Sequence, residues 1–195
     1  MSVIMKKIIL ASGSPRRREI LEKTGLTFVV RESAYEEDMT LPLTPVELVK
    51  HLAAGKARAV VADEPDALII AADTFIVFGD NVLGKPKTEE RAREMLKMLS
   101  GKENQVVTGV AIIDTATGLE VVFHDIAKVF IKELSEATIE AYIKTGDPLD
   151  KAGAYAIQGI GAVLIEKIEG DFFAVMGLPI SRLADELKKF GVIIL

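Results

Sequence analysis

Residues 8–21 read Ile-Ile-Leu-Ala-Ser-Gly-Ser-Pro-Arg-Arg-Arg-Glu-Ile-Leu and contain the first expected strand and the first expected helix. The apolar run 8–10 indicates a buried strand, and Pro15 suits the first position of a helix. Gly13 lets a ligand approach the backbone, and Ser14 is a natural N-cap. The three arginines that follow oppose the helix dipole, so helix stability does not explain them. Free amides and guanidinium groups at a helix start instead predict a site for an anion such as phosphate.

The composition limits the classes of function. The chain has 195 residues, of which 49% are hydrophobic and 27% charged, which fits a single globular domain with a sizeable core. The formal net charge of −5 argues against a nucleic-acid partner. The absence of cysteine excludes disulfides and thiolate chemistry. Because neither a signal-like N-terminus nor a membrane-length apolar run occurs, we expect a cytoplasmic protein without a membrane partner.

Apolar patterning predicts alternating strands and helices with two hairpin-like segments, and therefore a mixed rather than purely parallel sheet. The expected strands are 7–10, 27–31, 67–72, 75–78, 81–83, 106–115, 119–132 and 172–176, with a strand-like end to the glycine-punctuated segment 153–169. The expected helices are 15–24, 45–62, 89–99, 135–145 and 180–190. Helices packed on such a sheet would leave a ligand cleft at the strand ends.

Asp73 follows the apolar run 67–72 in the sequence Ala72-Asp73-Thr74. An aspartate at the carboxyl end of a buried strand commonly faces the ligand crevice of an α/β protein. A turn aspartate that caps a backbone amide gives the same pattern. The position alone leaves both interpretations open.

Two loop segments offer further charged groups. Glu36-Glu37-Asp38 is typical of a solvated acidic loop, but its carboxylates are also the ligands that a hard cation such as Mg²⁺ prefers. Gly84-Lys85-Pro86-Lys87 places a lysine beside a rigid proline, a pattern that solvated turn lysines share. Neither segment identifies a site by itself.

Residues 150–159 read Asp-Lys-Ala-Gly-Ala-Tyr-Ala-Ile-Gln-Gly. The small residues would allow a close backbone approach, with Lys151 on a phosphate and Gln158 on a base. The alternative is a tight connection with Tyr155 in the core.

In this order, the segments resemble the Maf family of nucleoside triphosphate pyrophosphatases from Ile8 to near the C-terminus. The matching stretches are 11–17, 72–74, 84–86, 150–159 and Gly-Leu-Pro at 177–179. The resemblance implies an α/β fold like that of inosine triphosphate pyrophosphatases: an elongated mixed β-sheet flanked by helices, in two lobes with a central cleft. It also implies a homodimer that hydrolyses a nucleoside triphosphate to the monophosphate and pyrophosphate, using Mg²⁺ or Mn²⁺.

Site residues follow from the same resemblance. Asp73 takes the place of the catalytic carboxylate, and the metal ligands would be Asp73 and Glu37, with Glu36 as an alternative to Glu37. The substrate-binding positions would be Ser12, Ser14, Arg16, Arg17, Lys56, Thr74, Lys85, Asp150, Lys151 and Gln158. Arg18 is expected to face solvent.

Arg17, Thr74 and Gln158 resemble the pattern of members that act on dTTP and UTP. The segment 102–105, Lys-Glu-Asn-Gln, departs from the threonine-histidine that the family often has there, which leaves the substrate range open. The alternatives are a pyrophosphatase for a modified purine triphosphate and a nucleotide-binding regulator of septum formation in cell division.

Overall fold

The computed structural model describes residues 6–195, which fall into two compact units. Unit 1 contains the residues up to Asp73 together with Thr108–Asp125 and Gly177–Leu195, and unit 2 contains Thr74–Val107 and Ile126–Met176. Among the helices of residues 6–195, none has both the length and the apolar character needed to cross a bilayer.

Seven strands form one hydrogen-bonded sheet in the order β2-β1-β3-β5-β6-β7, with β4 added on β3. The strands are β1 Lys7–Leu10, β2 Phe28–Val30, β3 Ala67–Phe78, β4 Asn81–Leu83, β5 Glu103–Asp114, β6 Glu120–Ile131 and β7 Ile165–Glu169. β1 pairs in parallel with both β2 and β3, whereas the β3–β4 and β6–β7 pairs are antiparallel. The predicted mixed sheet is therefore confirmed.

The helices begin at the signals that the sequence contains. They are α1 Pro15–Glu22, α2 Pro45–Val61, α3 Glu89–Leu99, α4 Glu136–Ile143, α5 Phe172–Met176 and α6 Ile180–Leu187, with short 3₁₀ turns after α4, before β7 and after α6. The hydroxyl groups of Thr44, Thr88 and Ser135 accept hydrogen bonds from first-turn amides of α2, α3 and α4.

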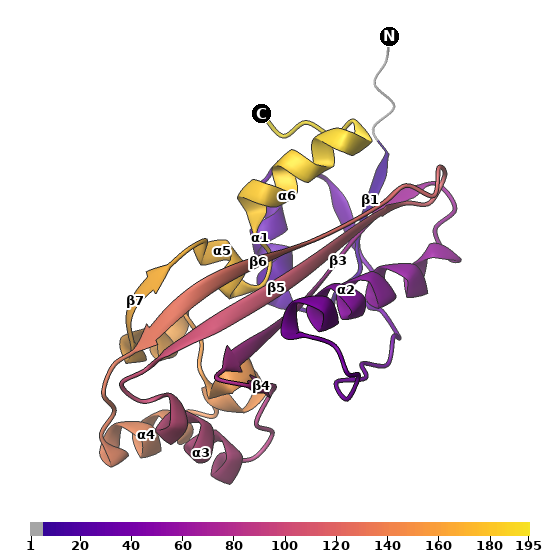
Figure 1. Ribbon diagram of the computed structural model, residues 1–195. Helices are drawn as coiled ribbons and strands as arrows, with labels where there is room; N and C mark the ends of the chain where they lie inside the picture. The colour runs from indigo at the N-terminus through magenta and orange to yellow at the C-terminus, as the bar shows by residue number, and fades with distance from the viewer. Residues whose placement is uncertain (1–5) are drawn as a thin grey trace. The chain divides into compact units, whose positions relative to one another are not determined.

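The core of unit 1 lies between α2 and alternate residues of the strands (Figure 1). Ile9 of β1 and Ile69 of β3 pack with Ala53 and Ala57 of α2, and all four side chains are fully buried. Gly109 of β5 allows the helix to come close, because a Cβ there would lie 2.5 Å from the carbonyl oxygen of Val49. α2 therefore packs tightly on the sheet at Val49, about two helical turns before Lys56.

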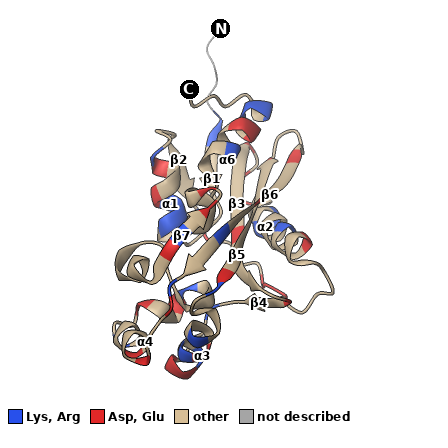
Figure 2. Ribbon diagram, turned by 60° about the vertical axis from the view of Figure 1, so that its left-hand side comes forward, with Lys and Arg blue, Asp and Glu red and all other residues tan. Residues whose placement is uncertain are grey.

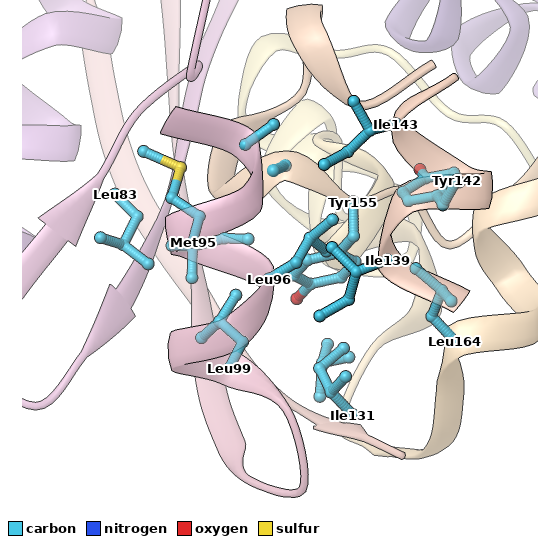
Figure 3. Close-up of a cluster of buried hydrophobic side chains, with 14 of the residues drawn as sticks. Leu83, Met95, Leu96, Leu99, Ile131, Ile139, Tyr142, Ile143, Tyr155 and Leu164 are labelled. Atoms are coloured by element: carbon cyan, nitrogen blue, oxygen red, sulfur yellow. The ribbon is translucent and has the colours of Figure 1, made fainter. Parts of the chain in front are cut away.

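The core of unit 2 is a separate apolar cluster from α3, α4 and the neighbouring strands (Figure 3). It buries Tyr155, which confirms the core interpretation of that residue. The phenol of Tyr155 donates to Asn104 Oδ1 at 2.7 Å, and Asn104 Nδ2 donates to the Val129 carbonyl at 3.1 Å. Burial raises the pKa of Tyr155 above its ordinary value, so this hydroxyl stays protonated as a donor.

Two expectations about local structure are wrong. The segment 172–176 is the short helix α5 and not a strand, because Asp171 Oδ1 accepts the Phe173 amide at 2.7 Å and starts a helical turn. An apolar run of this length carries no period that separates the two structures. The second error concerns Asp73, which does not end its strand, since β3 continues to Phe78.

Candidate functional site

Asp73 lies inside β3 on the face that α2 covers. Alternation along the strand puts Ile69, Ala71 and Asp73 on the same side of the sheet. The Asp73 side chain is only 10% exposed. A carboxylate buried to this degree needs a charged or hydrogen-bonding partner.

Lys56 is that partner, and it holds a second carboxylate as well. Its Nζ lies 2.6 Å from Asp73 Oδ1 and 2.7 Å from Glu37 Oε1. The lysine projects from the stripe of α2 that includes Ala53, Ala57 and Val60, so its side chain is 13% exposed. Of the two loop glutamates considered from the sequence, Glu37 is the one paired with Lys56.

The two carboxylates fit a divalent cation that is shared with a phosphate. They already converge on one positive charge, and carboxylate oxygens are the donors that Mg²⁺ and Mn²⁺ prefer. No group of three or more potential metal-ligating side chains occurs within residues 6–195. Mg²⁺ commonly takes one or two carboxylates and completes its shell with water and substrate phosphates.

Arg17 is fixed beside the serine turn of unit 1. Its Nε donates to the Gly177 carbonyl at 2.9 Å, and its Nη1 donates to Ser12 Oγ at 3.2 Å. Burial lowers the pKa of Arg17 from its ordinary value, the charge of Asp73 opposes this shift, and Arg16 adds to it. The guanidinium remains charged, because arginine does not lose its proton in proteins. Figure 2 shows the basic positions of α1 in blue.

The serine turn differs in detail from the expectation. Ser14 occupies the N-cap position of α1, but its side chain makes no capping hydrogen bond. Ser12 Oγ instead accepts the Ser14 amide at 3.3 Å, in addition to the bond from Arg17. Arg16 is half-buried, whereas Arg18 is exposed and pairs with Glu22 at 2.8 Å, as expected for a solvent-facing arginine.

In unit 2 the structure joins the predicted segment 84–87 to residues 149–153, which include the start of the predicted segment 150–159. The Gly153 amide donates to the Gly84 carbonyl at 3.1 Å, and the Lys87 amide donates to the Leu149 carbonyl at 3.2 Å. Lys87 and Ala154 have positive φ angles of 65° and 62°, a conformation that residues other than glycine rarely adopt. Such strain persists only where the surrounding structure imposes it, and it is concentrated at functional sites.

The remaining predicted residues of unit 2 lie on or near these segments. Lys85 is exposed in the first, and Lys151 in the second pairs with Asp150 and lies 3.8 Å from Asp147. Gln158 is half-buried just before the 3₁₀ turn Gly159–Leu164, and Thr74 is half-buried in β3. The structure thus brings Glu37, Lys56 and Asp73 together in unit 1 and the two loops together in unit 2.

Sequence reasoning missed Tyr35, which comes two residues before Glu37, and Gly55, which precedes Lys56; the two contact each other. Their signal in the sequence is weak, since a helical glycine is only mildly unfavourable. The sequence carries a stronger signal at Lys56. Its charge interrupts an apolar helical stripe, which indicates a buried partner.

A mixed sheet packed with helices, with the buried Asp73 of β3 paired to Lys56 of α2, defines an α/β protein with a charged site. The particular family is given by comparison: a family model described as "Maf-like protein" matches residues 7–190. The chain belongs to this family.

Curated relatives match nearly the whole chain. A dTTP/UTP pyrophosphatase from Desulforamulus reducens is 48% identical over 188 residues, covering 96% of this chain and 98% of the relative. Proteins of the same name from Pelotomaculum thermopropionicum and Clostridioides difficile are both 49% identical, over 96% and 94% of this chain and 98% and 94% of their own lengths. A solved structure, the Ham1 protein of Staphylococcus aureus, aligns with 76% of this chain and 85% of its own at 17% identity, with a TM-score of 0.47.

Proposed function

We propose that this protein hydrolyses dTTP and UTP to the nucleoside monophosphate and pyrophosphate. The relatives of that name, 48–49% identical over nearly the full chain, support the substrate class. The observation that carries the chemistry is the convergence of Glu37 and Asp73 on one ammonium group at 2.7 and 2.6 Å. Carboxylates that can hold a metal ion and a lysine that can neutralise phosphate charge suit a metal-assisted attack on a polyphosphate.

The basic residues neutralise the triphosphate. In this proposal Arg16, Arg17, Lys56 and Lys85 contact the β and γ phosphates, which leave as pyrophosphate. Ser12 and Ser14 contribute the turn at the start of α1, where free amides suit an anion. Arg17 is held by the Gly177 carbonyl and Ser12 Oγ, so little side-chain entropy remains to be lost on binding.

Glu37 and Asp73 would hold Mg²⁺ or Mn²⁺, which when bound neutralises phosphate charge and lowers the pKa of a coordinated water. Asp73 accepts the proton of the water that attacks the α-phosphorus. Its burial on β3 keeps its carboxylate in one orientation. Lys56, whose single positive charge lies between the two carboxylates, reduces their mutual repulsion.

Selectivity for pyrimidines is assigned to Gln158, Thr74 and Arg17. A half-buried amide such as that of Gln158 can donate to and accept from a pyrimidine edge. Asp150 and Lys151, which form an ion pair, complete the proposed substrate-binding segment.

The test is pyrophosphate release measured over a panel of common and modified nucleoside triphosphates with Mg²⁺ or Mn²⁺. We expect dTTP and UTP to be turned over fastest. Equal rates with purine triphosphates would contradict the role of Gln158, and preference for a modified purine would favour that alternative substrate. Tight nucleotide binding without turnover would favour the regulator of cell division. Arg17→Ala should raise the KM for nucleotide, whereas Arg18→Ala, which alters an exposed arginine on the same helix, is the matched control and should leave it unchanged.

Two expectations from the family resemblance remain predictions within this proposal. We expect a homodimer, which light scattering of the purified protein checks. We expect the protein in the cytoplasm, which cell fractionation checks.

A further inference from the structure

The loop between β2 and α2 places Glu37 beside Lys56, although residues 36–38 belong to no helix or strand. Glu36, Glu37 and Asp38 are all exposed. Asp38 bonds locally to the Thr40 amide and hydroxyl at 2.8 and 2.6 Å. These local bonds shape the turn but do not attach it to α2.

Tyr35 provides an attachment two residues before Glu37. Its ring lies against Gly55 of α2 so closely that a Cβ there would be 2.3 Å from Cζ and 2.5 Å from Cε2. Its hydroxyl lies 3.3 Å from Nε2 of His51, one helical turn before Gly55. The phenol of Tyr35 therefore packs on one face of α2, against Gly55 and beside His51.

Gly55 has no backbone reason to be glycine. It lies within the regular helix α2, where glycine is less favourable than alanine. It is not among the residues with positive φ. The missing side chain is explained by the ring of Tyr35, which occupies the space that a Cβ would fill.

We infer that Tyr35 and Gly55 form an anchor that positions Glu37 beside Lys56. The anchor joins residues 35 and 55, and the ion pair joins residues 37 and 56, at 2.7 Å. The contacting residues are two apart in the loop and adjacent in α2. Packing of the Tyr35 ring against Gly55 therefore restricts where the Glu37 carboxylate can lie. Tyr35 is thus a positioning residue for Glu37, and its effect on metal binding rests on the proposed function.

A double-mutant cycle tests the anchor without nucleotide. Four proteins are compared: wild type, Tyr35→Ala, Gly55→Ala and the double variant. In wild type, Gly55→Ala should displace the ring, so Tm should not rise and hydrogen exchange of residues 32–44 should become faster. In the Tyr35→Ala background the ring is gone, and the same change should raise Tm by about 2 °C through helix propensity. If Gly55→Ala raises Tm equally in both backgrounds and leaves the exchange of 32–44 unchanged, the anchor is overturned.

A second readout tests what the anchor positions. Mn²⁺ binding is measured by the loss of the free-ion EPR signal in the presence of α,β-imido-dTTP, which is not hydrolysed. The reference is the same analogue without protein, because the triphosphate itself binds Mn²⁺. We expect the Mn²⁺ dissociation constant to rise about tenfold in Tyr35→Ala and in Gly55→Ala, as for other residues that orient a metal ligand, with no further rise in the double variant. Tyr35→Phe, which keeps the ring, should restore wild-type affinity.

The two readouts separate the possible failures. Unchanged Mn²⁺ affinity in Tyr35→Ala, alongside tight binding by wild type, overturns the positioning of Glu37. Absence of Mn²⁺ binding by wild type overturns the proposed function, and the Tm cycle then still decides whether the anchor exists.

Discussion

The two units hold their predicted site residues in different ways. In unit 1, Lys56 and Asp73 project from a helix and a strand and meet through an ion pair of 2.6 Å. In unit 2, two loops are tied by backbone hydrogen bonds of 3.1 and 3.2 Å, with left-handed residues at Lys87 and Ala154. Unit 1 therefore depends on side-chain charge, whereas unit 2 depends on backbone shape. At these predicted site residues, charge substitutions should act mainly in unit 1, and substitutions that disturb the loop backbone should act mainly in unit 2.

The largest expected effect comes from Asp73→Asn in unit 1. Removing the charge removes the proposed proton acceptor and one of the two carboxylates on Lys56, so kcat should fall by about 10³-fold. Pyrophosphate release from dTTP measures it. Asp66→Asn, an exposed carboxylate just before β3, is the control and should retain full activity. Near wild-type turnover in Asp73→Asn would end the catalytic assignment.

In unit 2 the corresponding change is Gly153→Ala. A Cβ there would lie 2.5 Å from Ile76 Cδ1, at a φ of 65°. We expect a loss of about 2–3 kcal/mol in the free energy of unfolding, measured by urea denaturation. Gly159→Ala is the matched control, since its φ is 66° but nothing lies within 4 Å of its Cβ. It should lose only about 1 kcal/mol. Equal losses in the two variants would show that the contact with Ile76 does not contribute to the loss in free energy of unfolding.

A smaller effect is expected from Tyr155→Phe, which tests how a hydrogen bond attaches the segment 150–159 to the core of unit 2. The change leaves Asn104 Oδ1 buried without the donor it has at 2.7 Å, so stability should fall by about 1–2 kcal/mol. Tyr35→Phe removes a hydroxyl that lies 3.3 Å from Nε2 of the exposed His51, where water can take its place. Thermal unfolding should therefore show a smaller loss for Tyr35→Phe than for Tyr155→Phe, and the reverse order would contradict this account.

The smallest effect concerns acid stability in unit 1. Glu64 accepts from Lys7 Nζ at 2.6 Å and from Arg31 Nε at 3.2 Å, and the bond from Lys7 holds the pKa of this carboxyl below its ordinary value. A lowered pKa stabilises the fold above the unfolded pKa of 4.5, and this contribution is lost as pH falls through the folded pKa. In Glu64→Gln, Tm should therefore decline less than in wild type on acidification below pH 4.5. Glu22→Gln, in an exposed pair with Arg18, should decline as wild type does.

Much of the fold was predictable because its signals are local. Thr44, Thr88 and Ser135 begin helices where the sequence places capping residues, and hydrophobic periodicity defines the stripe of α2. The continuation of β3 past Asp73 was not predictable from such signals. A buried charge looks like a strand end unless its partner is known, and Lys56 is 17 residues away.

Local patterns indicated an anion site at the start of α1 and a carboxylate at Asp73, but how the site residues combine was accessible only through the family resemblance. No local pattern joins Glu37 to Lys56 or residue 153 to residue 84, because each contact depends on how separate segments pack. Lys56 was assigned to phosphate, and its pairing with both carboxylates became visible only in three dimensions. The same holds for Tyr35, whose partner Gly55 has no distinguishing local sequence.

The position of Asp73 within β3 restricts how the length of this chain can vary. Adding or deleting one residue between Ala67 and Asp73 would turn the carboxylate to the opposite face of the sheet, away from α2. A two-residue change would keep the face but move the carboxylate about 7 Å along the strand, beyond the reach of Lys56. Length variation between members of the family should therefore be absent from this segment and concentrated in turns such as Ala116–Gly118, where a change in length alters no strand register.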